Sequence, residues 1–307
     1  IKGSIMMNEL SEKILKLKKE KNAIILAHLY QIPEVQEIAD YVGDSYYLSQ
    51  VARDAKEDLI IFCGVKFMAE SAKVLSPDKT VILPAPNAGC PMADMAEVED
   101  VEEMIKEYPD AFKVCYINSS YEVKALCDAS VTSSSALNIM NNIPNKQILF
   151  LPDQNLGGYI AEFFPEKEFI LWRGFCPTHH RITAEDVLNA KQEHPNVKVL
   201  AHPECSKEVR ELSDYLGSTS GIIDYATKCE DNEFIIATEE GVLHQLQKKN
   251  PNKKFYFPEM MVCPNMKKTT LQDIYDALDG KREEVVLDEE IRQKALTSLE
   301  NMHKLGN

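Results

Sequence analysis

The feature that most constrains the fold of this chain is a cysteine–proline pair that occurs three times at almost equal spacing. Cys90, Cys176 and Cys263 each precede a proline, and successive pairs are 86 and 87 residues apart. Self-similarity at a fixed period is typical of repeated structural units. A chain of 307 residues is long enough for about two or three domains, each with its own core.

The segments that precede the cysteines repeat as well. Three of them align in register: "IILAHLYQIPEVQEIADYVGDS", "KVCYINSSYEVKALCDASVTSS" and "KVLAHPECSKEVRELSDYLGST". Each opens with an apolar run that ends in a polar pair, and each reaches a hydroxyl 17 residues after the first member of that pair. The pairs are His28 with Tyr30, Tyr116 with Asn118, and His202 with Glu204, and the hydroxyls belong to Ser45, Ser133 and Thr219. These coincidences predict three homologous units.

Apolar runs alternate with amphipathic stretches inside each unit, which indicates parallel strands joined by helices. In the first unit the expected strands are 23–28, 40–43, 59–64 and 80–84, and the expected helices are 33–39, 45–56 and 66–76. Helices are also expected at 7–20 before the first strand, at 93–107, 183–193 and 269–279 after the cysteines, and at 288–304. Threonines that precede the helices near 183 and 270 are suitable N-caps.

The predicted fold class is therefore α/β, with three homologous three-layer α/β/α units that contain short parallel sheets. We expect the units at residues 1–88, 89–175 and 176–280, with the C-terminal segment 281–307 packing on the first. Ligands of open parallel sheets bind beyond the carboxyl ends of the strands, and the polar pairs, hydroxyls and cysteines all lie there. We expect the units to be arranged with pseudo-threefold symmetry around a central active site.

The charge of the chain limits the class of partner. There are 34 lysines and arginines against 49 aspartates and glutamates, a net charge of −15. This balance disfavours nucleic acid and anionic membrane surfaces as partners, and an anionic substrate would need its own local donors. We find neither a secretory pattern nor an apolar run long enough to cross a membrane, so a cytoplasmic location is expected.

The eight cysteines favour metal binding, catalysis or core packing, because disulfides are rare in such a location. Core packing is expected for Cys63, Cys115, Cys127, Cys205 and Cys229, which lie in apolar runs or lack metal-site spacing. The three repeated cysteines suit a metal centre better than a disulfide, which uses two. Structural zinc usually takes four ligands, whereas a [4Fe–4S] cluster held by three thiolates leaves one iron open as a Lewis acid. The alternative is that three cysteines end three copies of a fold and bind no metal.

The polar pairs suit a small anionic substrate. His28 and His202 can donate hydrogen bonds and, when protonated, offer positive charge. Tyr30, Tyr116 and Glu204 are candidates for proton transfer. The short hydroxyl donors near expected helix N-termini are those of Ser45, Ser133, Ser218 and Thr219. Each histidine could instead be a structural strand-end residue, and Lys267 and Lys268 could either offset negative charge at the site or lie on a solvated face.

Several segments, taken in order, resemble the quinolinate synthase family, the A protein of bacterial NAD biosynthesis. They are "ILAHLYQIPEVQEIADYVGDS", "CPMA", "YINSS", "PDQNLG", "HPEC", "GSTSG", "TEEG" and "CPNMKKTTL", and the resemblance runs from about residue 10 to 305. Leu29 departs from the family, which usually has asparagine there. The segment "LWRGFCPTHH" also differs from the usual "GHCPVH", although Cys176 and His179 keep their spacing.

The resemblance implies a reaction, a cofactor and a set of site residues. The reaction condenses iminoaspartate (iminosuccinate) with dihydroxyacetone phosphate and gives quinolinate, phosphate and water. The implied cofactor is one [4Fe–4S] cluster with Cys90, Cys176 and Cys263 as ligands. The implied catalytic residues are Tyr30, Glu204 and Tyr116, and the implied substrate site consists of His28, Ser45, Met68, Tyr116, Ile117, Asn118, Ser133, His202, Pro203, Glu204, Ser218 and Thr219. Functional coupling to an aspartate-oxidising enzyme follows from the same resemblance.

Two other functions compete with this one. One is a different dehydratase that uses a [4Fe–4S] cluster on the same scaffold. The other is a non-enzymatic sensor of iron or of a metabolite, which would need no proton-transfer groups and therefore agrees poorly with Tyr30, Tyr116 and Glu204. We also expect one unit to hinge over the site, because ring closure requires that water be excluded.

Overall fold

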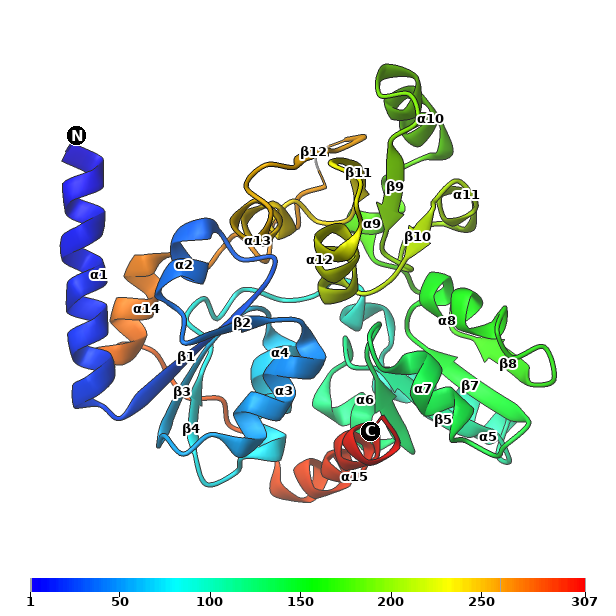
Figure 1. Cartoon of the computed structure of the whole chain (residues 1–307). Helices are drawn as coiled ribbons and strands as arrows, with labels where there is room; N and C mark the ends of the chain where they lie inside the picture. The colour runs from blue at the N-terminus through cyan, green and yellow to red at the C-terminus, as the bar shows by residue number, and fades with distance from the viewer. Residues whose placement is uncertain (1, 260, 307) are drawn as a thin grey trace.

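The structure, a computed structural model that describes residues 2–259 and 261–306, contains three four-stranded parallel sheets (Figure 1). The first sheet consists of β1 (Ala23–His28), β2 (Tyr41–Gly43), β3 (Leu59–Cys63) and β4 (Thr80–Ile82), in the order β2-β1-β3-β4. The second consists of β5 (Phe112–Tyr116), β6 (Ala129–Val131), β7 (Gln147–Leu151) and β8 (Glu168–Leu171). The third consists of β9 (Lys198–Ala201), β10 (Tyr215–Leu216), β11 (Glu233–Ala237) and β12 (Lys254–Tyr256). All three sheets have the same strand order, which confirms the predicted α/β class of three similar units.

Helices connect the parallel strands and cover the sheets. The first unit contains α2 (Pro33–Ile38), α3 (Ser45–Asp54) and α4 (Lys66–Leu75), and the second contains α6 (Tyr121–Ala125), α7 (Ala136–Asn141) and α8 (Gln154–Ala161). The third contains α11 (Lys207–Glu211), α12 (Thr219–Lys228) and α13 (Val242–Lys249). The helices that follow the cysteines are α5 (Val98–Glu107), the short α9 (Pro177–His180), α10 (Ala184–Glu193) and α14 (Leu271–Leu278).

The helix predicted at 93–107 is interrupted. A single 3₁₀ turn covers Ala93–Met95, and α5 begins only at Val98 because Ala96 and Glu97 have extended backbones. Ala96 is buried in the core of the second unit, and its extended backbone directs its side chain into that core. Helices α10 and α14 begin at capping boxes, in which Thr183 pairs with Asp186 and Thr270 pairs with Asp273, as the sequence predicted for the threonines.

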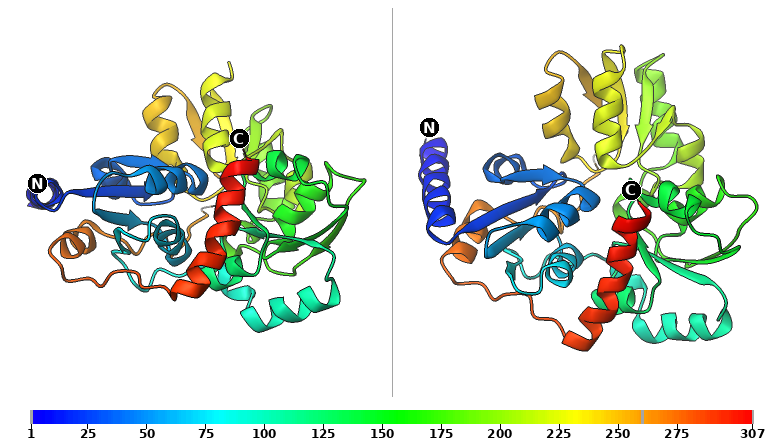
Figure 2. Two further views of the ribbon diagram at one scale, coloured as in Figure 1. Left: turned by 90° about the horizontal axis from the view of Figure 1, so that it is seen from below. Right: turned by 60° about the horizontal axis from the view of Figure 1, so that its bottom comes forward.

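The first strand of each sheet is central and its inner residues are buried. Ile24, Val114 and Val199 are each almost fully inaccessible, which explains why these strands read as continuous apolar runs. Figure 2 shows three lobes, one for each sheet, that meet near the middle of the molecule. The carboxyl ends of the strands lie toward this junction. The pseudo-threefold symmetry and the unit boundaries stay predictions.

The terminal helices tie the units together. Helix α1 (Lys2–Glu20) lies against α14, so a helix from the start of the chain packs beside one from near its end (Figure 1). Helix α15 (Glu289–Leu305) packs on α4 of the first unit and on α6 and β6 of the second (Figure 2). Arg292 donates to the Val74 carbonyl at 3.1 Å, and Ser298 lies 2.7 Å from the Ser130 hydroxyl. Helix α15, which belongs to the segment 281–307 that was expected on the first unit, thus contacts both the first and the second unit.

No helix in the described part of the chain is long and apolar enough to cross a bilayer.

Candidate active site

One cavity of about 170 Å³ lies where the three units meet. Most of the residues singled out from the sequence line it: His28, Tyr30, Ser45, Met68, Cys90, Tyr116, Asn118, Ser133, Cys176, His202, Glu204, Thr219 and Cys263. They come from all three sheets, because each lies at or beyond the carboxyl end of a parallel strand or, like Ser45 and Met68, belongs to the helix that comes next. The structure therefore brings together residues that are up to 235 positions apart in sequence.

Three of the predicted substrate residues do not line this cavity. Ile117 is buried in the apolar core between the first and second units. Ser218 is the N-cap of α12 and accepts the N–H of Gly221 at 3.1 Å. Pro203 lies in the turn between His202 and Glu204 and is also absent from the lining. Any role of these three in substrate binding stays a prediction.

The first and third units place a histidine on the cavity in the same way. The Nδ1 atom of His28 accepts the N–H of Tyr30 at 3.1 Å, and the Nδ1 atom of His202 accepts the N–H of Glu204 at 3.2 Å. The proton of each neutral ring therefore lies on Nε2. In the third unit, that Nε2 is 3.1 Å from the Ser133 hydroxyl of the second unit.

Burial decides the charge of these two rings. It lowers the pKa of His28 to about 3 and the pKa of His202 to about 4, although the nearby carboxylate of Glu204 acts in the opposite direction. Both imidazoles are consequently neutral at neutral pH. They serve the cavity as N–H donors rather than as positive charges.

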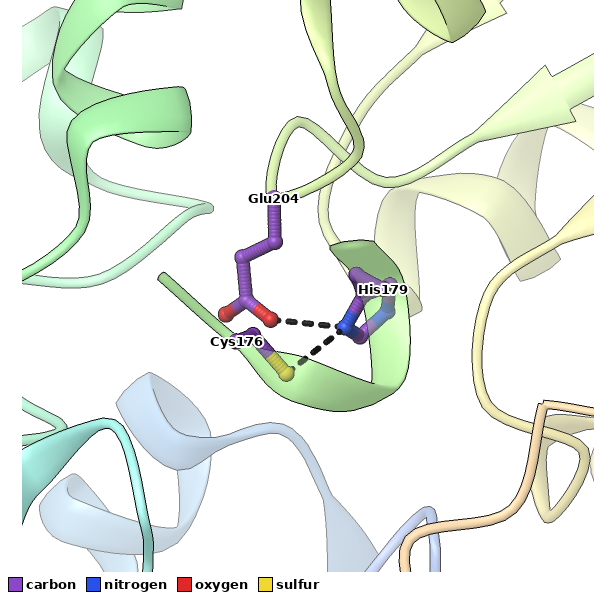
Figure 3. A group of neighbouring side chains, drawn as sticks. All are labelled: Cys176, His179 and Glu204. Atoms are coloured by element: carbon purple, nitrogen blue, oxygen red, sulfur yellow. Dashed lines mark hydrogen bonds and ion pairs between the residues drawn. The ribbon is translucent and has the colours of Figure 1, made fainter. Parts of the chain in front are cut away.

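Glu204 is the centre of a buried hydrogen-bond network, and its side chain points toward His179 and Cys176 (Figure 3). Its Oε1 accepts the Tyr116 hydroxyl at 2.5 Å, and its Oε2 is 2.8 Å from His179 Nδ1. Burial disfavours the charge of the carboxylate, but His179 and the Tyr116 hydroxyl more than offset it and hold the pKa of Glu204 below its usual range. Burial together with Glu204 raises the pKa of Tyr116 well above its usual value. The pair is thus a carboxylate beside a protonated phenol.

Tyr30 reaches the cavity from the first unit, and threonines of the third unit hold its hydroxyl. The oxygen lies 2.8 Å from Thr219 Oγ1 and 2.9 Å from Thr238 Oγ1. Burial raises the pKa of Tyr30 well above its usual value, and the carboxylate of Glu204 adds to this effect. Tyr30 is therefore a neutral phenol that can donate a proton.

The three repeated cysteines line the cavity as free thiols. Burial raises the pKa of all three, that of Cys90 to about 12, so the thiols are protonated until a metal displaces the proton. A single ion at roughly 2.3 Å from each sulfur requires the sulfurs to lie within about 4.6 Å of one another. The three thiols do not form a group that tight within the described residues, where Cys176 instead groups with His179 and Glu204 within 4.8 Å. The arrangement suits a group of several atoms that spans the cavity better than one ion.

A buried ion pair supports the Cys263 loop. The Glu239 carboxylate accepts the N–H of Cys263 at 3.0 Å and pairs with Lys267 Nζ at 2.9 Å. Lys267 also donates to the carbonyl of Tyr30 at 2.8 Å. The loop is therefore fastened both to the end of β11 and to the turn that carries Tyr30. The charge of Lys267 is matched by Glu239, so this lysine does not lie on a solvated face.

Sequence reasoning missed several residues at this site. Thr238 and Glu239 directly follow β11, so the rule that strand ends carry the site could have found them. His179 follows Cys176 by three residues on the short helix α9, a spacing that one helical turn brings together. Leu29, a position at which the sequence departs from the resemblance, packs into the apolar cluster of the third unit and does not line the cavity.

The chain resembles known proteins over almost its whole length. Residues 12–304 match the family model described as "Quinolinate synthetase A protein". Quinolinate synthase of Clostridioides difficile (strain 630) is 60% identical over 302 residues, which cover 98% of this chain and 99% of the relative. Quinolinate synthase of Clostridium perfringens (strain SM101 / Type A) is 60% identical over 299 residues, which cover 97% and 99%. Quinolinate synthase of Caldicellulosiruptor bescii is 56% identical over 298 residues, which cover 97% and 98%.

Proposed function

Because the chain belongs to the quinolinate synthetase A protein family, and is thereby an enzyme of NAD biosynthesis, we propose that it forms quinolinate from iminoaspartate and dihydroxyacetone phosphate. The other products are phosphate and two waters. One observation carries the proposal: three cysteine loops and a buried Tyr116–Glu204 pair line a single cavity, in a chain that matches the family throughout. Iminoaspartate is the two-electron oxidation product of aspartate, so we propose functional coupling to an enzyme that oxidises aspartate.

We propose that Cys90, Cys176 and Cys263 hold a [4Fe–4S] cluster. The fit rests on three thiols that face one cavity and are too far apart for a single ion. When bound, such a cluster supplies a Lewis acid at the iron that no cysteine holds, which can polarise a substrate oxygen. The proline after each cysteine restricts the loop and offers no competing N–H.

The chain's own donors would hold the anionic substrates. His28 and His202 offer neutral Nε2–H groups, and Ser45, Ser133 and Thr219 offer hydroxyls, so carboxylate and phosphate oxygens can each be hydrogen-bonded. These donors are neutral, so they would hold an anion by hydrogen bonds alone. Substrate binding would then need no positively charged side chain, although the net charge of the chain is −15.

Proton transfer would fall to Tyr30, Tyr116 and Glu204. The two phenols enter the reaction protonated, and Glu204 enters it as a carboxylate. A dianionic substrate beside Glu204 would raise the pKa of that carboxyl, because like charges disfavour its ionised form. The bound substrate would thereby bring Glu204 closer to the working range of a general base.

An anaerobic assay tests the proposed function. Reconstituted protein that is given iminoaspartate and dihydroxyacetone phosphate should form quinolinate and release one phosphate for each quinolinate. A reaction without dihydroxyacetone phosphate serves as the control. Protein with its full iron content that forms no quinolinate would contradict the proposal and favour a different cluster-dependent dehydratase.

A further inference from the structure

Thr238 occupies the position between Tyr30 and His179. It follows β11 directly and is completely buried. Its Oγ1 atom lies 2.9 Å from the Tyr30 hydroxyl and 2.9 Å from His179 Nε2. A hydroxyl carries one donor and two acceptor lone pairs, so Thr238 can satisfy both contacts at once.

These contacts complete a continuous series of hydrogen bonds across the cavity wall. The series runs from Tyr30 through Thr238 to His179, whose Nδ1 is 2.8 Å from the Glu204 carboxylate. Glu204 in turn accepts the Tyr116 hydroxyl. One threonine therefore joins the proton-transfer candidate of the first unit to those of the second and third.

The backbone beside Thr238 is packed tightly on Tyr30. A Cβ atom added at Gly241 would lie 2.7 Å from the Tyr30 Cα, a distance that real Cβ atoms do not show. Gln36 closes the same contact from the first unit, because its Nε2 donates to the Gly241 carbonyl at 3.2 Å. The turn after β11 thus has little room to move relative to Tyr30, and Thr238 is a fixed point against which the phenol is held.

We propose that Thr238 is a positioning residue whose hydroxyl aligns the Tyr30 phenol with the His179 imidazole and, through His179, with Glu204. The inference rests on the proposed function for the roles of Tyr30 and Glu204. Valine has nearly the shape of threonine and cannot form either hydrogen bond. Serine keeps the hydroxyl and loses only a methyl group.

The test compares Thr238→Val with Thr238→Ser in the reconstituted enzyme. Thr238→Val should lower kcat about 10-fold or more while KM changes less than about 3-fold, because misalignment of reacting groups affects the transition state more than binding. Thr238→Ser should recover most of the activity, and iron content should be equal in both. Thr269→Val is the matched control, since Thr269 is a buried threonine of the same unit whose hydroxyl has no partner among the described residues. Its kcat should match the wild type.

A double variant tests whether Thr238 acts through Tyr30. Tyr30→Phe combined with Thr238→Val should be no slower than Tyr30→Phe alone, because residues that act as a unit have non-additive effects. If Thr238→Val does not fold, Thr238→Ala takes its place in both comparisons. Wild-type kcat in the hydroxyl-free variant, or fully multiplicative losses in the double variant, would overturn the inference.

A measurement without turnover separates this inference from the proposed function. In protein labelled with ¹⁵N-histidine, Thr238→Val should shift the ring nitrogen resonances of His179, and Thr238→Ser should not. His179→Gln assigns those resonances. An unchanged His179 spectrum in Thr238→Val would overturn the positioning role even if the enzyme forms quinolinate. A shifted spectrum in a protein that forms no quinolinate would instead contradict the proposed function alone.

Discussion

The residues that line the cavity form two sets, the repeated cysteines (called the cysteine side) and the polar strand-end pairs (called the polar side), and these sets have diverged to very different degrees. On the cysteine side every unit contributes the same pair, a cysteine followed by a proline. On the polar side the equivalent strand ends carry different side chains, which are His28 with Tyr30, Tyr116 with Asn118, and His202 with Glu204. Repetition suits a compact group that needs one similar ligand from each unit. Divergence suits a substrate whose carboxylates, phosphate and transferred protons all need different partners.

The first and third units show how small that divergence is in structural terms. In both, the backbone N–H two residues after the histidine donates to its Nδ1. The residue that supplies this N–H is Tyr30 in the first unit and Glu204 in the third. The same turn therefore presents a phenol in one copy and a carboxylate in the other. A shared backbone fixes the positions, and single side chains assign the chemistry.

The largest expected effect comes from removing one of the repeated ligands. Cys176→Ala should lose both the cluster and the activity, because two thiolates would hold the cluster poorly. Iron analysis and the visible absorption of anaerobic protein measure this. Cys229→Ala is the control, since Cys229 does not line the cavity, and it should keep both. A Cys176→Ala protein that retains its full iron content and its activity would contradict the assignment of Cys176 as a cluster ligand.

The next effect concerns the polar side alone. Glu204→Gln should keep the cluster but lower kcat about 100-fold, because the amide cannot accept a proton in the transition state. Steady-state kinetics on protein of known iron content measure the loss. Glu208→Gln removes an exposed carboxylate of the same unit and should have no effect. Near-normal turnover of Glu204→Gln would remove this residue from proton transfer.

A smaller effect is expected where the two sides are connected. Lys267→Met leaves the buried Glu239 carboxylate without its counter-ion and frees the Tyr30 carbonyl. Supporting interactions of this kind typically contribute about 10-fold to metal retention, so a chelator should remove iron about 10-fold faster. Lys254→Met breaks an exposed ion pair with Glu233 in the same unit and should retain iron like the wild type. Equal rates in both variants would mean that the Cys263 loop needs no such support.

The smallest effect is an absence of pH dependence. The pKa of His28 is lowered to about 3 and that of His202 to about 4. Both rings are therefore already neutral at pH 6.5, where a histidine with its ordinary pKa of about 6.5 would be half protonated. KM for the dicarboxylate substrate should therefore be constant between about pH 6.5 and 8.5. Binding by positively charged histidines would instead weaken as the pH rises through their pKa. A KM that rises with pH across this window would contradict the neutral-donor assignment.

The repeat allowed much of the fold to be predicted from the sequence. Apolar runs at equivalent positions identified all four strands of the first unit, and the Cys-Pro spacing identified the three copies. The strand-end rule then placed the polar pairs and cysteines at one cavity. Comparison of the copies also shows why Glu239 was missed. The equivalent position carries an acid in the second unit, Asp153, but Val65 in the first, so the repeat signals an acidic residue there in only two of the three copies.

The sequence alone could predict neither the contacts between units nor the protonation states of the site residues. Thr238 meets Tyr30 across 208 residues, and nothing in either segment encodes that pairing on its own. The sequence also left open whether His28 and His202 are charged. Their neutrality follows from burial, which only the packed structure reveals.

Iron and acid-labile sulfide analysis of anaerobically reconstituted wild-type protein tests the central claim most directly. Three cysteine loops that share one cavity should hold about four irons and four sulfides per chain. One iron without sulfide, or no iron at all after careful reconstitution, would contradict the account.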